Sequence, residues 1–440
     1  MSIDADLLAE LKARPNNNMV VFELDLKTGT TYKYSEAWAA ASAGMYEGRV
    51  VQSGSIERSV SDSGFNLPDD SATVTIHDDV ARTLEQVLMG SAVGSIAGTA
   101  ARIKLASKTL ASSKWFTLFS GVVSSFASPS PFLWTFSLKR DDKALKSLIS
   151  IPAIQSYDWP NAPSDSLGIS ANVVYGKHSS TGTAVTGMVP TTYVDNSGFR
   201  YLISYGRISS LDAVYVDGVL EAAANYALTY VETNGRSWSL VDFTSDQGAT
   251  ADITVDCEGF ETNGDGSSGA VIVNPATQLE HLLTNFVFGT WMTGSWLTTA
   301  SYPINETYVA EVETYLSDKG IAKGSRVIPG SRKGIDVLNE WCSQFQVASF
   351  WTYAGKLAIR VDDHTTTGYV SAPHFRQEIS PEPEARAVTF SSRELVDEVR
   401  TEYIYSAADG DFQKQLTVKD GSKGHNAAES ISLEWRESVA

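Results

Sequence analysis

The sequence predicts a multidomain protein that is mainly β, with α+β parts. Three patterns support this prediction. Short segments with alternating apolar and polar residues recur through the first 150 residues. Two-residue Asp-Gly and Asn-Gly turns separate such segments around residues 217 and 235. Apolar stripes with the period of a helix lie between residues 274 and 346. A chain of 440 residues is long enough for about three or four domains.

Residues 1–150 form the first block, in which four segments alternate with period two and therefore predict strands with one buried face. These segments are 20–26, 72–78, 102–105 and 132–138. A helix is expected over 78–90, capped by Asp78 or Asp79 and ended by Gly90. Its apolar stripe consists of Val80, Leu84, Val87 and Leu88. A short surface helix is expected before Pro15, with Leu7, Leu8 and Leu11 on one side. The helix over 78–90, packed against a small antiparallel barrel, is typical of assembly modules.

The second block begins with residues 151–170, where three prolines among polar residues predict a linker. Residues 171–270 are expected to be all β. The strand 212–220 contains the turn Asp217-Gly218, and strands 226–232 and 237–243 flank Asn234-Gly235. These dipeptides supply the positive φ angles of type I′ hairpins. A last strand over 251–257 and a flexible connection over 261–269 complete a block that we expect to be separable.

The third block, about 271–370, predicts three helices and a hairpin. The first begins at Asn274-Pro275, a cap followed by proline at the first helical position, and buries Leu279, Leu282, Leu283, Phe286 and Val287. The second covers 305–319, with the stripe Tyr308, Val312, Tyr315 and Leu316. The third covers 333–346, with Ile335, Leu338, Trp341, Cys342 and Phe345 facing inward. The hairpin covers 349–361. In the fourth block, 371–440, strands are expected at 399–405 and 414–418.

The composition restricts the classes of function. The chain has 34 basic and 52 acidic residues and therefore a net charge of −18, which argues against a nucleic-acid-binding surface. Cys257 and Cys342 are interpreted as small buried thiols, although one disulfide between them is possible. Two cysteines are too few for a secreted disulfide scaffold or a zinc site built on cysteine. Residues 1–14 do not resemble a signal peptide, and no apolar stretch is long enough for a membrane anchor.

Each candidate for chemistry has a simpler structural explanation. Glu306, Glu311 and Glu313 could be glycosidase carboxylates, but their shared helix predicts a solvated face. The cluster at 362–364, Asp-Asp-His, could bind a metal, but a polar turn is favoured. Residues 263–266 have calcium-loop composition without the glutamate at position twelve of an EF-hand. GxSxG, HExxH and Walker sequences are missing. The sequence therefore predicts no enzyme and no catalytic, cofactor-binding or metal residues.

Aromatic residues raise the question of a sugar-binding surface, because aromatic faces stack on sugars. Trp134, Trp238 and Trp341 lie within strand or helix patterns, which predicts core packing. Trp291 and Trp296 lie in a Gly/Thr/Ser-rich stretch, and this pair remains a candidate for contact with a ligand or partner.

The layout resembles the hub proteins at the tail tip of flexible-tailed and contractile phages, and their relatives in Mu-like phages. The stretch from Met45-Tyr46-Glu47-Gly48-Arg49-Val50 to Phe119-Ser120-Gly121-Val122-Val123 is similar to the first tube-like domain of such hubs. Residues 214–228 resemble a β-module of phage tail proteins, and 274–359 resemble the hub's peripheral domain. Residues 397–403 resemble the opening strand of the second tube-like domain.

The resemblance implies four domains. They are a tube-like β-barrel domain with one helix (1–150), a linker with a β-rich insertion module (151–270), a peripheral α+β domain (271–370) and a second, incomplete tube-like β domain (371–440). In the family the second tube-like domain continues with a helix and closing strands, whereas this sequence stops at 435–440. The resemblance thus suggests an abbreviated domain, or one that another chain completes.

The function implied is that of a structural baseplate or tail-tip hub in a phage virion, made in the host bacterial cytoplasm. Such hubs are homotrimers whose ring joins the tail tube to the tip proteins and lines the DNA exit channel. The implied partners are the distal tail protein, the tail tube or tape-measure protein and the tip or fibre proteins. Genomic DNA would pass without specific binding.

Two other functions remain open. One is the distal tail ring protein that lies next to the hub. The other, from a different class, is a carbohydrate-binding or glycan-cleaving tail protein, which binding of soluble sugar would distinguish from a hub.

Overall fold

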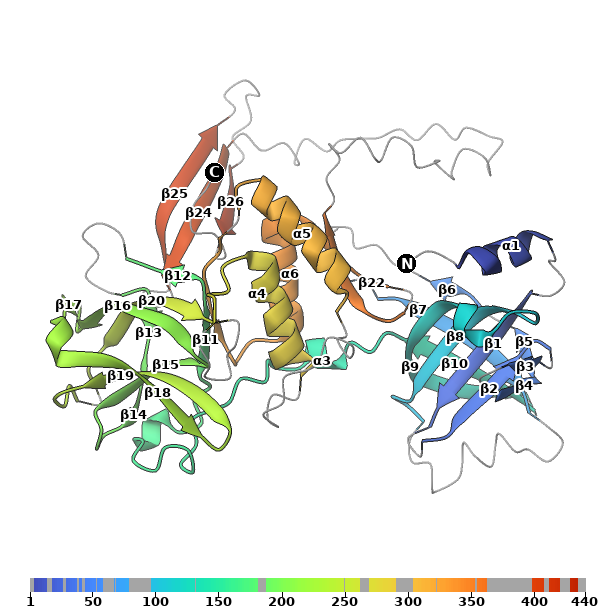
Figure 1. The fold of residues 1–440 in the computed structure, drawn as a ribbon, viewed down its shortest axis with the longest axis horizontal. Helices are drawn as coiled ribbons and strands as arrows, with labels where there is room; N and C mark the ends of the chain where they lie inside the picture. The colour runs from blue at the N-terminus through green and yellow to red at the C-terminus, as the bar shows by residue number, and fades with distance from the viewer. Residues whose placement is uncertain are drawn as a thin grey trace. The chain divides into compact units, whose positions relative to one another are not determined.

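The computed structural model describes most of the chain (Figure 1). The described residues are 4–13, 18–26, 29–37, 39–41, 44–52, 54–57, 67, 69–78, 96–130, 132–180, 187–248, 250–261, 269–289, 304–321, 323–352, 354–361, 398–406, 411–419 and 428–433. The chain divides into two compact units. The first comprises 1–147, 298–306 and 348–359, and the second comprises 148–297, 307–347 and 360–440.

The first unit is built mainly from strands. Its elements include α1 (Ala5–Ala13), β1 (Asn18–Asp25), β2 (Thr31–Ser35), β3 (Ala39–Ala41), β4 (Gly44–Gly48), β5 (Val50–Gln52), β6 (Ile56–Glu57), β7 (Ser71–His77), β8 (Ala100–Ser107), β9 (Phe116–Ser130), β10 (Leu133–Lys139) and α3 (Lys143–Lys146). The four strands predicted in this block are confirmed as β1, β7, β8 and β10, and α1 confirms the short N-terminal helix. The predicted helix over 78–90 lies outside the described residues, apart from Asp78.

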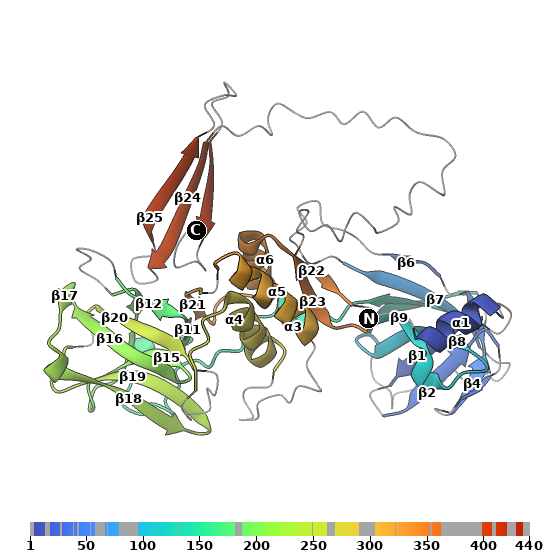
Figure 2. The same ribbon diagram turned by 45° about the horizontal axis from the view of Figure 1, so that its top comes forward.

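One strand, interrupted at Arg49, closes the sheet of the first unit into a barrel. β4 pairs in parallel with β2, through Tyr34 opposite Glu47. β5 follows directly and pairs antiparallel with β7, through Val50 opposite Ile76. The sheet between these points runs β2-β1-β8-β9-β10-β7. Residues 44–52 therefore join its two ends. Figure 2 shows β1, β2, β4 and β8 of this sheet together in the first unit.

Side chains at alternate positions fill the barrel. Phe22 and Leu24 from β1, Phe119 from β9 and Phe136 from β10 are fully buried in one cluster, and the rings of Phe22 and Phe136 lie 5.6 Å apart. Each such side chain stabilises the fold by roughly 1.5–3 kcal/mol. The interior is thus a packed core, as in other small barrels.

The second unit begins with a connection that is packed although it has little regular structure. Residues 148–171 contain one short 3₁₀ turn, Ser164–Ser166. Ile151, Ile154 and Trp159 are nonetheless buried. The backbone N–H of Ile154 donates to the carbonyl of Ile169 at 2.9 Å, so the two halves of the segment are tied together.

Strand β11 (Asn172–Tyr175) leads into a β-sandwich. The strands of the sandwich are β12 (Lys177–His178), β13 (Val189–Pro190), β14 (Thr192–Asp195), β15 (Arg200–Tyr205), β16 (Ile208–Val216), β17 (Val219–Leu220), β18 (Tyr226–Thr233), β19 (Arg236–Phe243) and β20 (Ile253–Phe260). One sheet has the order β14-β15-β19-β18, and the other has the order β12-β20-β16-β17 with β13 on β20. Their inner faces share one apolar cluster that includes Tyr201, Val214, Val241 and Val255.

Both predicted type I′ turns are confirmed. Asp217 and Gly218 have φ angles of 48° and 77°, and Asn234 and Gly235 have φ angles of 51° and 72°. A side chain with a branched Cβ would be strained at these positions, which explains the Asp-Gly and Asn-Gly pairs.

The three predicted helices are confirmed as α4 (Pro275–Leu282), α5 (Glu306–Asp318) and α6 (Gly334–Phe345), and α4 continues into a π-helical turn, η5 (Leu283–Val287). The side chain of Asn274 accepts a hydrogen bond from the backbone N–H of Ala276 at 2.9 Å, which confirms the cap. All five residues of the stripe predicted for the first helix are buried. On α5 the buried face is Val309, Val312 and Leu316, and the predicted Tyr308 and Tyr315 are half-buried beside it.

The remaining strands are β21 (Arg326–Pro329), which pairs with β11, and the hairpin β22 (Val347–Trp351) and β23 (Leu357–Val361). Near the C-terminus, β24 (Glu398–Ser406) pairs antiparallel with β25 (Asp411–Lys419) and in parallel with β26 (Ala428–Leu433). The predicted strands here are confirmed as β24 and β25, whereas β26 was not predicted. The fold is therefore mainly β with α+β parts, as expected. Among the described residues, no helix is long and apolar enough to cross a membrane.

Candidate assembly site

The carboxylates considered for catalysis do not form a site in the described residues. Glu306, Glu311 and Glu313 are exposed on α5. Across the described ranges, no three His, Cys, Asp or Glu side chains gather closely enough to hold a metal ion. The cluster 362–364, the loop 263–266, and Trp291 and Trp296 lie outside the residues that the structure describes.

The tryptophans predicted to pack in cores do so. Trp134 is buried in the barrel, and Trp238 and Trp341 are fully buried in the second unit. The indole N–H of Trp341 donates to the carbonyl of Pro275 at 3.1 Å, which ties α6 to the start of α4.

Both cysteines are buried, and they do not form a disulfide with each other. Cys257 belongs to the apolar core of the sandwich. Burial raises the pKa of its thiol well above the usual range, and the nearby carboxylate of Asp256 adds to this effect. A thiol in this state is a poor nucleophile.

Two buried histidines lie where β11 meets the rest of the second unit. Nε2 of His178 lies 3.0 Å from the carbonyl oxygen of Tyr175, and Nδ1 of His281 lies 2.7 Å from the hydroxyl of the same tyrosine. Burial lowers the pKa of His178 to about 4 and that of His281 to about 3. Phe260 and Phe286 pack against the ring of His281. Both imidazoles are therefore neutral parts of the packing at ordinary pH.

A polar network covers part of the outer wall of the barrel. Glu23 accepts hydrogen bonds from the hydroxyl of Tyr46 at 2.5 Å, from Nε of Arg102 at 2.8 Å and from Nζ of Lys104 at 2.9 Å. Burial by itself would raise the pKa of Glu23, but these hydrogen bonds outweigh it and the pKa is lowered. The carboxylate is thus fully occupied by its neighbours, and its role is to hold β1, β4 and β8 together.

A cavity of about 310 Å³ lies in the second unit. Its walls are mainly apolar and come from Ser150, Ile151, Pro152, Ala153, Gln155, Tyr157 and Arg236. The guanidinium of Arg236 is already paired with Asp158 at 2.7 Å and lies over the ring of Tyr157. The cavity wall therefore offers no pair of groups for acid–base or nucleophilic chemistry.

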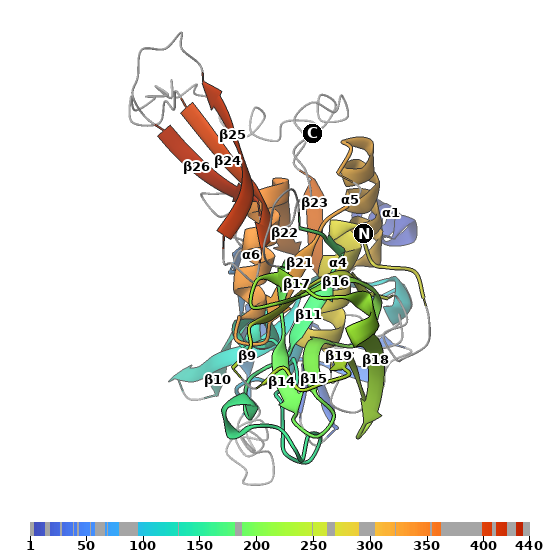
Figure 3. The same cartoon turned by 90° about the vertical axis from the view of Figure 1, so that its left-hand side faces the viewer.

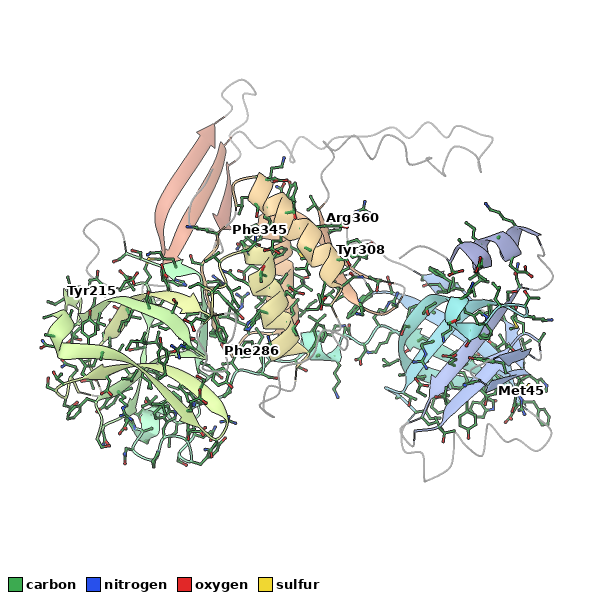
Figure 4. The ribbon with its side chains drawn as sticks, viewed as in Figure 1. Met45, Tyr215, Phe286, Tyr308, Phe345 and Arg360 are labelled. Atoms are coloured by element: carbon green, nitrogen blue, oxygen red, sulfur yellow. The ribbon has the colours of Figure 1, made fainter. Side chains whose placement is uncertain are left out.

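Among the features of the described residues, the open strand edges are the best candidate for a binding site for another chain. The three-stranded sheet has the order β25-β24-β26, so each outer strand has a described partner on one side only. Among the strands that the structure describes, β3 likewise pairs only with β4. Met45 of β4 and Val51 of β5 are each 60% exposed. Figure 4 labels Met45 on the first unit. Unpaired N–H and C=O groups beside exposed apolar side chains favour contact with another chain.

Sequence reasoning placed no strand at β2, β11, β14, β15, β21 or β26, and it missed the closure of the barrel at Arg49. The alternation in Ala428–Leu433 is short and mixes Glu and Ser with Ile and Leu, which gives a weak signal. β26 pairs in parallel with β24. Parallel strands are not joined by a tight turn, so the sequence contains no turn motif that predicts this pairing.

No protein-family model matches the sequence, and no curated protein matches it. Among solved structures, one similar chain comes from the virion of a native gene transfer agent particle. The identity is 13%, the match covers 59% of this chain and 85% of that chain, and the TM-score is 0.27. Another is the 43 kDa tail protein of prophage MuSo2 from Shewanella oneidensis, with 10% identity, coverage of 94% and 73%, and a TM-score of 0.31. Both TM-scores are too low to establish a common fold, and neither match assigns a function.

Proposed function

We propose that the chain is a structural protein of a tailed-phage virion, namely the hub of the baseplate or tail tip. Three copies would form a ring that joins the tail tube to the tip proteins and lines the DNA exit channel. The observation that carries the proposal is the combination of one closed barrel with a second sheet whose outer strands lack partners among the described residues. An open edge needs a strand or a cover from elsewhere, which suits a subunit of an assembly.

The packing of the barrel restricts where a channel would run in such a ring. Apolar side chains fill the barrel interior, so the channel would be bounded by the outer walls of several copies. The net charge of −18 suits a surface past which DNA moves without binding. The proposed neighbours are the distal tail protein, the tail tube or tape-measure protein and the tip or fibre proteins.

The proposed role is not enzymatic. Support comes from the described residues alone, in which the candidate carboxylates on α5 are exposed and both thiols are buried. The cavity beside Arg236 also lacks a set of reacting groups.

Electron microscopy of the full chain, produced alone and together with the tail proteins of its phage, tests the proposal. The expected result is a ring with three-fold symmetry at the tip of the tail tube. A six-fold ring would instead identify a distal tail ring protein. Binding or cleavage of a soluble glycan by the purified chain would favour the carbohydrate-related function, and either result would overturn the hub proposal.

A further inference from the structure

Strand β18 differs from the other edges of the β-sandwich in the described ranges. At the opposite edge of its sheet, β14 has four residues, and its pairing shifts register between Tyr193 and Asp195. In the second sheet the edge strands β12, β13 and β17 have two residues each. The uncovered part of β16 carries a register shift between Leu211 and Ala213. Shortness and bulges are the usual protections of an edge, and β18, with eight residues, has neither.

The pairing of β18 with β19 is regular from end to end. It runs from Tyr226 opposite Phe243 to Thr233 opposite Arg236 without a register shift. Because a two-residue turn joins the strands, Thr233 and Arg236 form the closing hydrogen-bonded pair, and hydrogen-bonded pairs then alternate along the ladder. The backbone groups of Tyr226, Leu228, Tyr230 and Glu232 therefore point away from β19. In the described part of the chain, no strand pairs with that side.

The side chains of β18 fix the strand and leave its edge accessible. Tyr226 and Leu228 pack against the sandwich core. The hydroxyl of Tyr230 donates to the carbonyl of Ile208 at 2.8 Å, and the guanidinium of Arg207 lies 4.2 Å from the centre of the Tyr230 ring. Figure 3 shows β18 outermost in its sheet, beyond β19. An incoming strand would thus meet an edge that is already ordered, which lowers the entropic cost of pairing.

The sequence of β18 also lacks the residues that usually protect an edge. Tyr226-Ala-Leu-Thr-Tyr-Val-Glu-Thr233 contains no Pro, Lys or Arg, and its single charge is the exposed Glu232. Beyond the other end of the strand, the carboxylate of Glu221 accepts a hydrogen bond from the side chain of Asn225, the residue before Tyr226. Each end of the open edge therefore has a carboxylate close by.

We propose that β18 binds an extended strand of another protein, whose ends carry basic residues. The backbone groups of the edge would supply the ladder, and Glu221 and Glu232 would attract the basic ends. A second copy of this chain is a poor occupant. Antiparallel pairing of two β18 strands would place Glu232 of each copy toward the Glu221 end of the other, and each chain carries a net charge of −18. This inference goes beyond the proposed tail function and does not depend on it.

The probe for this site is a fluorescein-labelled decapeptide, KTVTVTVTVK, titrated into the full chain with fluorescence anisotropy as the readout. We expect saturable binding that weakens as salt is raised. Replacing both terminal lysines of the peptide with glutamate should weaken binding roughly tenfold, since two surface charge pairs are lost. A peptide N-methylated at alternate amides, which cannot form the ladder, should not bind. Amide exchange in 226–233 should slow when the first peptide is present.

Two variants of the chain locate the site. Glu232→Pro removes an N–H that points away from β19, so the ladder to β19 remains while docking is blocked. Glu232→Gln keeps the N–H and removes the charge, so the lysine-ended peptide should bind several-fold more weakly, with less dependence on salt. Circular dichroism and tryptophan fluorescence check that both variants fold. If Glu232→Pro does not fold, binding of the N-methylated peptide to the wild-type chain is compared with binding of the unmodified peptide. This comparison tests whether backbone pairing is required.

Three results would overturn the proposal. The first is failure of the folded wild-type chain to bind the lysine-ended peptide. The second is equal binding of the N-methylated peptide, because backbone pairing would then play no part. The third is a concentration-dependent dimer that disappears in Glu232→Pro, because the occupant of the edge would then be a second copy.

Discussion

Arg140 and Asp70 form a buried ion pair in the first unit. Nη2 and Nε of Arg140 lie 3.0 and 3.2 Å from Oδ2 of Asp70, and each side chain is 3% exposed. Nη1 of the same arginine donates to the carbonyl of Ser120 at 2.7 Å, and the guanidinium lies over the ring of Phe119. Asp70 precedes β7, Arg140 follows β10 and Ser120 belongs to β9. One arginine therefore fastens three neighbouring strands.

Replacing Asp70 with Ala should strongly destabilise the barrel. The change leaves the guanidinium buried without its carboxylate, which typically costs about 3–5 kcal/mol. Amide hydrogen exchange in β7 and β10 is the suitable measurement, because a melting temperature of the whole chain would mix its two units.

The neighbouring Asp69 provides a matched control for this change. Its side chain is 91% exposed and lies 3.9 Å from the exposed Lys146, so Asp69→Ala should change the stability of the barrel by less than about 0.5 kcal/mol. The double change Asp70→Leu with Arg140→Met should recover much of the loss. Equal exchange rates in Asp70→Ala and the wild-type chain would contradict the assigned role of the pair.

The two buried histidines predict a loss of stability in mild acid. Their pKa values in the folded chain, about 4 for His178 and about 3 for His281, lie below the value of 6.5 for an exposed histidine. The unfolded chain therefore binds more protons as the pH falls below 6.5, and the stability that these residues contribute is lost toward their folded pKa values. Between pH 7 and 5 each histidine should account for about 2 kcal/mol.

Urea unfolding of the second unit at several pH values between 7 and 5 measures this dependence. His281→Gln keeps an acceptor for the hydroxyl of Tyr175 and does not titrate, so it should remove about half of the loss. His77 belongs to the first unit, so His77→Gln is a control for the substitution itself and should not alter the unfolding of the second unit. A flat profile for the wild-type chain in this window would show that the histidines are not held neutral.

Both thiols should be inert in the folded chain. Cys257 and Cys342 are fully buried, and burial raises the pKa of Cys257, so little thiolate is present and the reagent has no access. Titration with Ellman's reagent at pH 8 should detect neither thiol in the native chain and both in denaturant. Rapid reaction of the native chain would contradict the packing of α6 or of the sandwich core.

The sandwich should not be removable, although its proline-rich entry and Gly/Ser-rich exit suggest a separable module. Deletion of 170–268 takes away β11, the partner of β21. It also removes Phe260, whose ring lies 4.7 Å from that of His281, and Tyr205, which packs against Phe286 at 6.0 Å. We expect the remainder of the second unit to lose α4 and α6. Limited proteolysis and circular dichroism measure the effect, and a compact, protease-resistant product would show that the module is independent after all.

Proline at Thr401 should prevent incorporation into the proposed ring. Thr401 lies in β24, the central strand of its sheet, opposite Leu416 of β25 and Ile431 of β26. Every N–H of a central strand points to a neighbour, so proline removes a ladder hydrogen bond and disrupts the sheet. Virions assembled with this variant should lack the chain at the tail tip, as seen by immunoblotting of purified particles. Proline at Ala428, the first residue of the outer strand β26, is a milder control. If particles that carry Thr401→Pro assemble normally, this sheet takes no part in ring assembly.

Local patterns in the sequence predicted the main helices and many strands of this protein, but not strands such as β2, β15 and β21. The period-two segments became β1, β7, β8 and β10, the Asn-Gly pair became the turn between β18 and β19, and the Asn274-Pro275 cap became the start of α4. These features depend on neighbouring residues alone, because side-chain alternation, positive φ angles and helix caps are local properties.

Only the tertiary structure decided how these elements combine. The interruption at Arg49 that lets one strand pair with both β2 and β7, the burial of His178 and His281, and the open edge of β18 all depend on partners that are distant in sequence. The same limit applies to the candidate site, because an open edge is defined by the strands that do or do not pair with it. It applies to the packing as well. Trp238 was predicted to lie in a core, but its contact with Trp159, which belongs to the predicted linker 151–170, was not predicted. A pattern specifies which face of a strand is apolar, whereas the strand that lies beside it is chosen by the packing of the whole chain.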